Sequence, residues 1–192
     1  MNEPLRQLEV RVGSATDALT PLSRVTRSFA ATRIQWLALA AIALSAIVAD
    51  QVTKRLVTDR VGMDEVHQVL PFLDVRHVRN TGIAFGVFPD RLELVSVATA
   101  VAVAWMLLHF ARSGARHVLF PVALGLIIGG SVSNLADRLR QGYVTDFIHL
   151  SHWPTFNLAD SFIVTGVVLL LIGVARLEHH PGRAEPASLN EA

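Results

Sequence analysis

The 192-residue sequence has no cysteine, and this absence removes several kinds of chemistry at once. Disulfides, iron–sulfur clusters, thiolate zinc sites and a cysteine nucleophile are excluded, and the redox compartment cannot be inferred from cysteine usage. An excess of one charge is also lacking, because the net charge is only +1. No stretch combines dense basic residues with interleaved aromatics, so we expect no nucleic-acid partner.

Long hydrophobic runs are what the sequence does contain. Hydrophobic residues make up 52% of the chain and gather in blocks, at residues 34–49, 92–110, 117–136 and 161–175. A helix needs roughly 20 residues to cross a bilayer, so the first block must continue through Asp50 toward Lys54 and the fourth must begin near Asn157. We therefore predict an integral membrane α-helical fold with four transmembrane helices, in which Asp50 and Asp160 lie at the membrane boundary.

The positions of the arginines indicate the orientation in the membrane. Arginines precede the first block, lie between the second and third, and follow the fourth. The positive-inside rule then predicts that both termini are cytoplasmic. With that topology, the polar residues near the ends of the helices converge on the outer face, and they are Asp50, Lys54, Asn80, Asn134, Asp137, Arg138, Asp146, Asn157 and Asp160.

We predict three regions along the chain: a mobile cytoplasmic tail at residues 1–30, a membrane domain at 31–178 and a polar cytoplasmic tail at 179–192. The start does not resemble a cleavable signal peptide, because its first apolar block begins only at Ile34. Residues 73–78 partly alternate apolar and polar side chains and precede a turn-forming Asn80-Thr81-Gly82, which predicts a small strand-bearing outer subdomain over about 58–91. We interpret residues 139–156 as an outer loop.

Asp146 and Asp160 are the candidate catalytic residues. Two carboxylates at the edge of a bilayer indicate acid–base chemistry on a lipid-embedded substrate. Hydrolysis of an amide without a metal or a cysteine needs an activated water, which two carboxylates sharing one proton supply. Taken alone, Asp146 is an ordinary loop acid, and Asp160 is a charge favoured by the helix dipole.

Other polar residues have positions that suggest supporting roles. Asn134 and Arg138 are four residues apart and share a helix face, where they can orient a substrate backbone or a lipid head group. Asp50 and Lys54 have the same spacing and form a predicted structural ion pair. We interpret Asp137 as structural too, paired with Arg138 at a helix end. His149 and His152 with Asp146 give a weak alternative, a metal site, and Gly125, Gly129 and Gly130 predict close helix packing.

Two other function classes remain open on these residues. A proton-coupled membrane transporter also keeps carboxylates in a membrane, but near the midplane rather than at one end. A non-enzymatic membrane assembly factor accounts for the helices and leaves the two blocks that combine Asn with Asp unexplained.

Five blocks of the sequence resemble, in order, those of bacterial lipoprotein signal peptidase, also called signal peptidase II. They are residues 50–54 (DQVTK), 80–86 (NTGIAFG), 129–138 (GGSVSNLADR), 142–148 (GYVTDFI) and 156–160 (FNLAD). The resemblance covers roughly residues 34–176. Two positions depart from the family pattern: Ser133 replaces the usual Gly, and Ile83 replaces a frequent Ala.

The resemblance implies an aspartyl endopeptidase of the bacterial cytoplasmic membrane, with outer strands forming a cradle over the site. Such an enzyme removes signal peptides from prolipoproteins, cutting before a cysteine that carries a diacylglyceryl group, and it is blocked by the cyclic peptide globomycin. The family's catalytic dyad corresponds to Asp146 and Asp160, and no cofactor is implied. The residues implied to line the site are Asn80, Asn134, Arg138 and Asn157.

Overall fold

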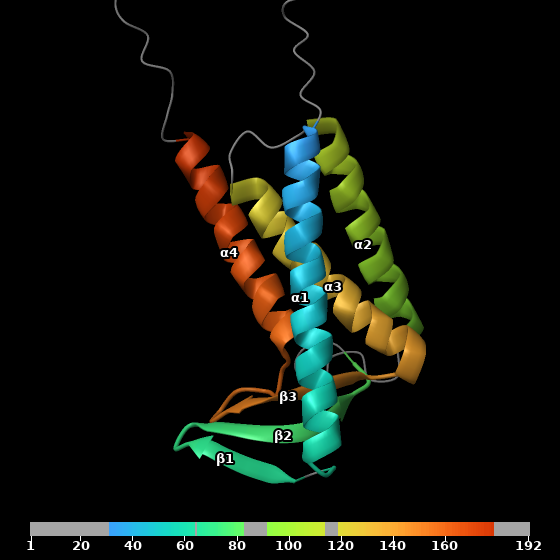
Figure 1. Ribbon diagram of the computed structural model, residues 1–192, viewed down its shortest axis with the longest axis vertical. Helices are drawn as coiled ribbons and strands as arrows, with labels where there is room; N and C mark the ends of the chain where they lie inside the picture. Colours follow the sequence, from blue (N-terminus) through green and yellow to red (C-terminus); the bar gives the residue numbers. More distant parts are fainter. Residues whose placement is uncertain (1–30, 64, 83–91, 114–118, 179–192) are drawn as a thin grey trace, which may run out of the picture.

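The structure, a computed structural model, describes residues 31–63, 65–82, 92–113 and 119–178. Its elements are α1 (Arg33–Arg60), β1 (Val66–Leu70), β2 (Leu73–Asn80), α2 (Leu92–Ser113), α3 (Leu119–Gln141), β3 (Val144–Leu150) and α4 (Leu158–Glu178). The helices run beside one another, and the strands lie together at one end of them (Figure 1). The two predicted tails and Ile83 lie outside the described residues.

Four helices in the described part are long and apolar enough to cross a membrane, which confirms the prediction from the hydrophobic blocks. Helix α1 begins at a capping box in which Thr32 and Gln35 satisfy each other's backbone N–H groups. Its 28 residues span about 42 Å, so α1 exceeds the thickness of a hydrocarbon core and continues past Asp50 and Lys54 as expected.

The outward faces of three helices are apolar, as a surface in contact with lipid requires. Large exposed hydrophobic side chains occur along α1 (Leu37, Leu44, Val48), α2 (Val97, Val101, Trp105) and α4 (Val167, Val168, Leu171). Inside the bundle, Leu39, Val103, Phe110 and Ile128 form a buried cluster that joins α1, α2 and α3. The surface is therefore more continuously apolar than that of a typical water-soluble domain.

Helix α3 is the central element, because it contacts each of the other three helices. Small residues make this possible. A Cβ atom on Gly129 would lie 2.6 Å from the carbonyl oxygen of Ala43 in α1, and one on Gly130 would collide with the carbonyl oxygen of Ala159 in α4. Close packing at these glycines, as predicted, sets the separation of α3 from both neighbours.

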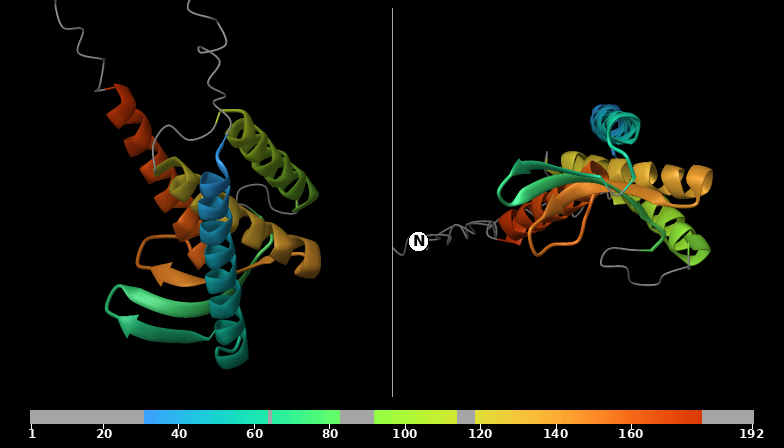
Figure 2. Two further views of the ribbon diagram at one scale, coloured as in Figure 1. Left: turned by 45° about the horizontal axis from the view of Figure 1, so that its top comes forward. Right: turned by 90° about the horizontal axis from the view of Figure 1, so that it is seen from below.

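The strands form one antiparallel sheet in the order β1-β2-β3 (Figure 2). The expected strand-bearing region is present as β1 and β2. The expectation of a loop at residues 139–156 is wrong, because Val144–Leu150 form β3 and pair with β2. Asp146 lies opposite Val78, and Asn80 lies opposite Val144, so Asp146 and Asn80 are diagonal neighbours on one face of the sheet.

Candidate active site

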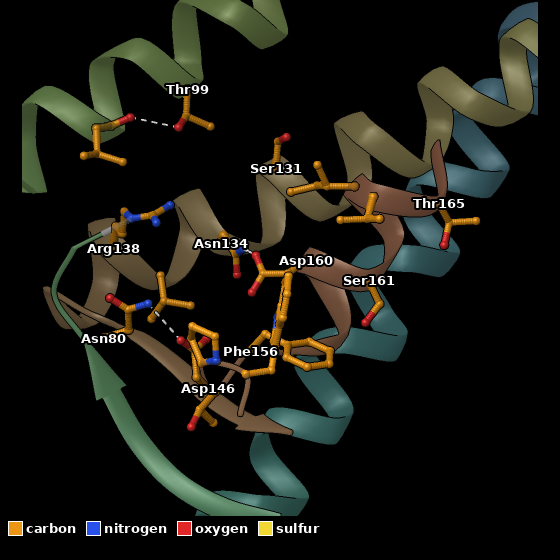
Figure 3. Close-up of a pocket in the computed structure, with 17 residues that line it drawn as sticks. Asn80, Thr99, Ser131, Asn134, Arg138, Asp146, Phe156, Asp160, Ser161 and Thr165 are labelled. Carbon is orange, nitrogen blue, oxygen red and sulfur yellow. Dashed lines mark hydrogen bonds between the residues drawn. The ribbon is translucent and has the colours of Figure 1, made fainter. Parts of the chain in front are cut away.

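A cavity of about 630 Å³ lies where the sheet meets α2, α3 and α4. Its polar lining comes from each of these elements, and Figure 3 shows these side chains gathered around the same space. The titratable and amide groups that line the cavity are Asn80, Asn134, Arg138, Asp146 and Asp160. Segments that are far apart in the chain thus contribute to one site at the end of the helices that carries the sheet.

Asp146 is held in place on β3 by two amides. Its Oδ1 accepts a hydrogen bond from Asn157 Nδ2 at 2.7 Å, and its Oδ2 accepts one from Asn80 Nδ2 at 2.8 Å. The pKa of Asp146 is raised to about 6, chiefly by burial and also by the nearby charge of Asp160, against the opposing effect of the two hydrogen bonds. A carboxyl group with this pKa exchanges a proton near neutral pH.

Asp160 is fixed by the first turn of α4. Asn157 precedes the helix as its N-cap, and its Oδ1 accepts the Asp160 N–H at 3.0 Å, while Asp160 Oδ2 accepts the Asn157 N–H at 3.2 Å. This reciprocal pair is a capping box with Asp in place of Glu. The other oxygen, Oδ1, accepts from Asn134 Nδ2 at 2.9 Å. The helix start therefore orients a carboxylate that lines the cavity.

Asn157 connects the two carboxylates without lining the cavity itself. It is fully buried, and its Nδ2 donates both to Asp146 Oδ1 and to Asn134 Oδ1, the latter at 3.1 Å. Because Asp146 is also held by Asn80, and Asn134 also donates to Asp160, this amide network sets the relative position of Asp146 and Asp160. The charge of Asp160 raises the pKa of Asp146, and such repulsion between two carboxyl groups favours a state that keeps one shared proton.

Arg138 brings a positive charge to the cavity wall. It lies one helical turn after Asn134, and both line the cavity, as their spacing predicts. Its Nη2 donates to the backbone oxygen of Gly82 at 3.4 Å, which ties the end of β2 to α3. Its buried Nε has no hydrogen-bond partner among the described residues. Because Arg138 lines the cavity and its guanidinium has five N–H donors, it can donate hydrogen bonds to a polar group bound there.

A second polar cluster lies beside the site and does not line the cavity. Lys54 Nζ contacts Asp50 Oδ2 and Asp137 Oδ2, both at 2.7 Å. Asp50 and Lys54 are paired as the spacing predicts, whereas the ion pair of Asp137 is with Lys54 and not with the adjacent Arg138. The helix geometry explains this, because Asp137 and Arg138 point about 100° apart on α3.

Sequence reasoning missed two members of this cluster. Ser133 Oγ donates to Asp50 Oδ2 at 2.7 Å, and Gln51 Nε2 donates to Ser133 Oγ at 3.0 Å and to Asp137 Oδ1 at 2.8 Å. Gln51 lies in the same motif as Asp50, and Ser133 immediately precedes Asn134, so adjacency was the available signal. The hydroxyl that departs from the family's usual Gly is therefore fully used in hydrogen bonding.

The geometry does not support the alternative of a histidine metal site. Asp146 and His149 are three residues apart on a strand, so their side chains leave opposite faces of the sheet. His152 lies beyond the strand in a left-handed turn conformation. Among the described residues, no group of three or more His, Asp or Glu side chains is arranged to hold a metal ion.

Comparisons with known proteins agree on one family. Residues 42–176 match the model of the family described as signal peptidase (SPase) II. The chain is 38% identical over 143 residues to a lipoprotein signal peptidase of Symbiobacterium thermophilum, covering 71% of this chain and 93% of that protein. A relative of the same description from Halothermothrix orenii is 38% identical over 134 residues, covering 68% and 90%.

Two solved structures of bacterial membrane enzymes are similar in fold. One, determined by the in meso method at 2.3 Å resolution, matches with a TM-score of 0.72 at 27% identity and covers 77% of this chain and 93% of its own. The other, at 1.9 Å resolution, has a TM-score of 0.65 at 28% identity and covers 71% and 91%. The matches in sequence and in fold extend over nearly the whole length of these relatives.

Proposed function

The chain belongs to the signal peptidase II family, and we propose that it removes signal peptides from prolipoproteins by an aspartyl mechanism, with Asp146 and Asp160 as the catalytic dyad. One observation carries the proposal. Two carboxyl groups from separate elements line one cavity, and neutral amides hold both of them. Family membership makes the chain a membrane-bound protease, and the dyad supplies its chemistry.

The dyad hydrolyses the peptide bond through a single activated water. The ionised carboxylate takes a proton from the water, whose oxygen attacks the scissile carbonyl carbon, while the protonated carboxyl donates its proton to the carbonyl oxygen. The tetrahedral intermediate then collapses. The carboxyl group that gained the water's proton gives it to the leaving nitrogen as the C–N bond breaks, and the other carboxylate recovers its proton from the oxygen. The pair ends with one proton, as it began.

The cavity also fits the substrate of this proposal. Most of its lining is apolar, with contributions from Val95, Ile163 and Val164, and it lies among helices that span the membrane. A diacylglyceryl-modified prolipoprotein can keep its acyl chains in the surrounding lipid while the peptide enters the cavity. Asn80, Asn134 and Arg138 then face the substrate backbone or head group, and Asn157 holds the dyad. Globomycin, a cyclic peptide, should occupy the same cavity.

The proposed location is the bacterial cytoplasmic membrane, with both termini in the cytoplasm and the active site near the outer face. The start of α1 and the end of α4 lie at the same end of the bundle, away from the sheet (Figure 1). This arrangement supports an even number of crossings. A transporter would need its carboxylates near the midplane, whereas Asp160 lies in the first turn of α4, beside the sheet.

Cleavage of a lipidated precursor tests the proposal. Purified protein in detergent micelles should release the signal peptide from a diacylglyceryl-modified prolipoprotein, with the cut before the modified cysteine, as mass spectrometry would detect. The unlipidated precursor should be cut poorly, because each methylene buried against protein instead of water contributes about 0.8 kcal/mol. Equal cleavage of both precursors would remove lipid recognition, and cleavage of neither would contradict the proposed activity.

A further inference from the structure

Lys54 is buried beside the dyad, and all three of its ammonium protons have partners. Two are directed at Asp50 and Asp137, and the third is donated to the side-chain oxygen Oδ1 of Asn134 at 2.8 Å. The Lys54 side chain is only 5% exposed and does not line the cavity, so it cannot contact a substrate there. Its closest connection to the chemistry therefore runs through Asn134.

The contact with Lys54 is one of those that favour a single orientation of the Asn134 amide. Asn134 Oδ1 accepts from Lys54 Nζ and from Asn157 Nδ2, and Asn134 Nδ2 donates to Asp160 Oδ1. If the amide were flipped, its NH₂ group would face two other donors, and its oxygen would face a carboxylate. An ammonium group has no acceptor, so the flipped orientation would lose its hydrogen bonds on both sides.

We infer that Lys54 is a positioning residue of the peptidase: by holding the Asn134 oxygen, it directs the Asn134 NH₂ group at Asp160 and so fixes the geometry of the dyad. The inference rests on the proposed function. Lys54 acts from α1, Asn134 from α3 and Asp160 from α4, so this chain of contacts links three membrane-spanning helices to one catalytic carboxylate.

Asp50, which pairs with Lys54, is itself fixed by further hydrogen bonds. Asp50 Oδ1 accepts the backbone N–H of Ala159 at 2.9 Å, and Asp50 Oδ2 accepts from Ser133 Oγ. The carboxylate that pairs with Lys54 therefore also holds the residue immediately before Asp160. Lys54 and the start of α4 are thus fixed to the same group, which keeps the distance from Lys54 through Asn134 to Asp160 constant.

A positioning role differs from a purely structural one in its effect on turnover. We expect Lys54→Met to lower kcat for a diacylglyceryl-modified prolipoprotein about 100-fold, the scale of loss when a catalytic group is misplaced by about 1 Å. KM should change by less than about threefold, because Lys54 does not touch the substrate. The matched control is Asp137→Asn, which removes another partner of Lys54 but leaves its contact with Asn134; its kcat should stay within about twofold of wild type.

Lys54→Met leaves the buried carboxylates of Asp50 and Asp137 without a cation, which destabilises the fold. A second variant therefore separates loss of folding from loss of positioning. The variant Lys54→Met/Asp137→Asn removes one positive and one negative group together and so keeps the formal net charge of the cluster. It should show the same loss of kcat as Lys54→Met alone. If it folds with near-wild-type thermal stability and retains wild-type kcat, the inference is wrong.

A double-mutant cycle isolates the route through Asn134. Asn134→Ala should lower kcat, and adding Lys54→Met to Asn134→Ala should lower it no further, because both changes remove the same orientation of the donor to Asp160. Multiplicative losses would overturn the inference. The dyad variants Asp146→Asn and Asp160→Asn test the proposed function separately, because full activity in either would contradict it. Normal kcat in the Lys54 variants would contradict only the positioning role of Lys54.

Discussion

The carboxyl groups of Asp146 and Asp160 receive their hydrogen bonds from amides, not from cations. The donors are the side chains of Asn80, Asn134 and Asn157 and the backbone N–H of Asn157. A cation in direct contact with either carboxylate would strongly favour loss of its proton. The positive charge of Lys54 is instead one amide away, through Asn134. The amides therefore orient the carboxyl oxygens of Asp146 and Asp160. Because they are neutral, the dyad can still retain the proton that its proposed mechanism uses.

Replacing either aspartate by asparagine should abolish cleavage. Asp146→Asn and Asp160→Asn keep nearly the same shape but cannot exchange a proton, so we expect each to lower kcat by about 10²–10⁴-fold or more while the protein still folds. The control is Asp59→Asn, the same chemical change at an exposed carboxylate near the end of α1, which should leave kcat unchanged. Signal-peptide release under single-turnover conditions is the measurement. Activity that EDTA abolishes and zinc restores would revive the metal alternative.

The pKa of Asp146 predicts how cleavage depends on pH. The pKa is raised to about 6 by burial, so as pH rises through this value the group ionises and the dyad loses its shared proton. We expect kcat/KM to fall about tenfold per pH unit on the alkaline side of the profile. A profile that is flat from pH 5 to pH 9 would contradict a shared-proton dyad.

Asn80 offers a way to move this pH limit in a known direction. Its hydrogen bond favours the ionised form of Asp146 and so lowers the pKa. Asn80→Ala should therefore raise the pKa further and shift the alkaline limb of kcat/KM to higher pH. Gln68→Ala, which removes an exposed amide from β1, is the control and should not move the limb. A shift to lower pH in Asn80→Ala would mean that Asn80 does not stabilise the carboxylate.

At the level of elements, the close packing of α3 against α4 positions Asp160. A Cβ atom at Gly130 would collide with the backbone oxygen of Ala159, which is adjacent to Asp160. Because backbone cannot move aside as a flexible side chain does, Gly130→Ala should displace the start of α4. We expect a loss of about 1–3 kcal/mol in stability, typical of overpacking, together with a lower kcat.

Gly173→Ala is the matched control for this change, since it lies on the same pair of helices far from the site. The Cβ atom added there would be 3.5 Å from the side chain of Phe120, an ordinary contact. Thermal unfolding in detergent and the cleavage assay measure both effects. If Gly130→Ala and Gly173→Ala behave alike, the close approach at Gly130 is not what positions Asp160.

At the level of the whole molecule, the polar chemistry lies at one end of the membrane bundle. Both termini in the cytoplasm would put the sheet and the cavity on the outer side. Reporter fusions at Gly62 and at Gly114 should then report opposite compartments, Gly62 outside and Gly114 inside. Alkaline phosphatase and green fluorescent protein fusions give complementary readouts. A cytoplasmic signal at Gly62 would mean that the topology is inverted and that the proposed site does not lie at the outer face.

Much of the membrane architecture was determined by the sequence alone. Four apolar blocks are enough to predict four spanning helices, because the bilayer sets a minimum length and a helix satisfies its own backbone hydrogen bonds. The same length argument extended α1 past Asp50 and began α4 beside Asn157. The spacing of Asn134 and Arg138 predicted a shared face, because the repeat of a helix is fixed.

Contacts between distant segments depended on the tertiary structure. Val144, Thr145, Phe147 and Ile148 favour a strand locally, but this preference depends on context and does not by itself separate a strand from a loop. Pairing with β2 decided it. Likewise, Asp137 has an adjacent arginine in sequence and pairs with Lys54 on another helix. The sequence predicted which polar residues gather at the candidate site and on which elements most of them lie. Only the packing of α1, α3, α4 and the sheet decided which donor meets which carboxylate, because hydrogen bonds depend on distances between elements that no local pattern encodes.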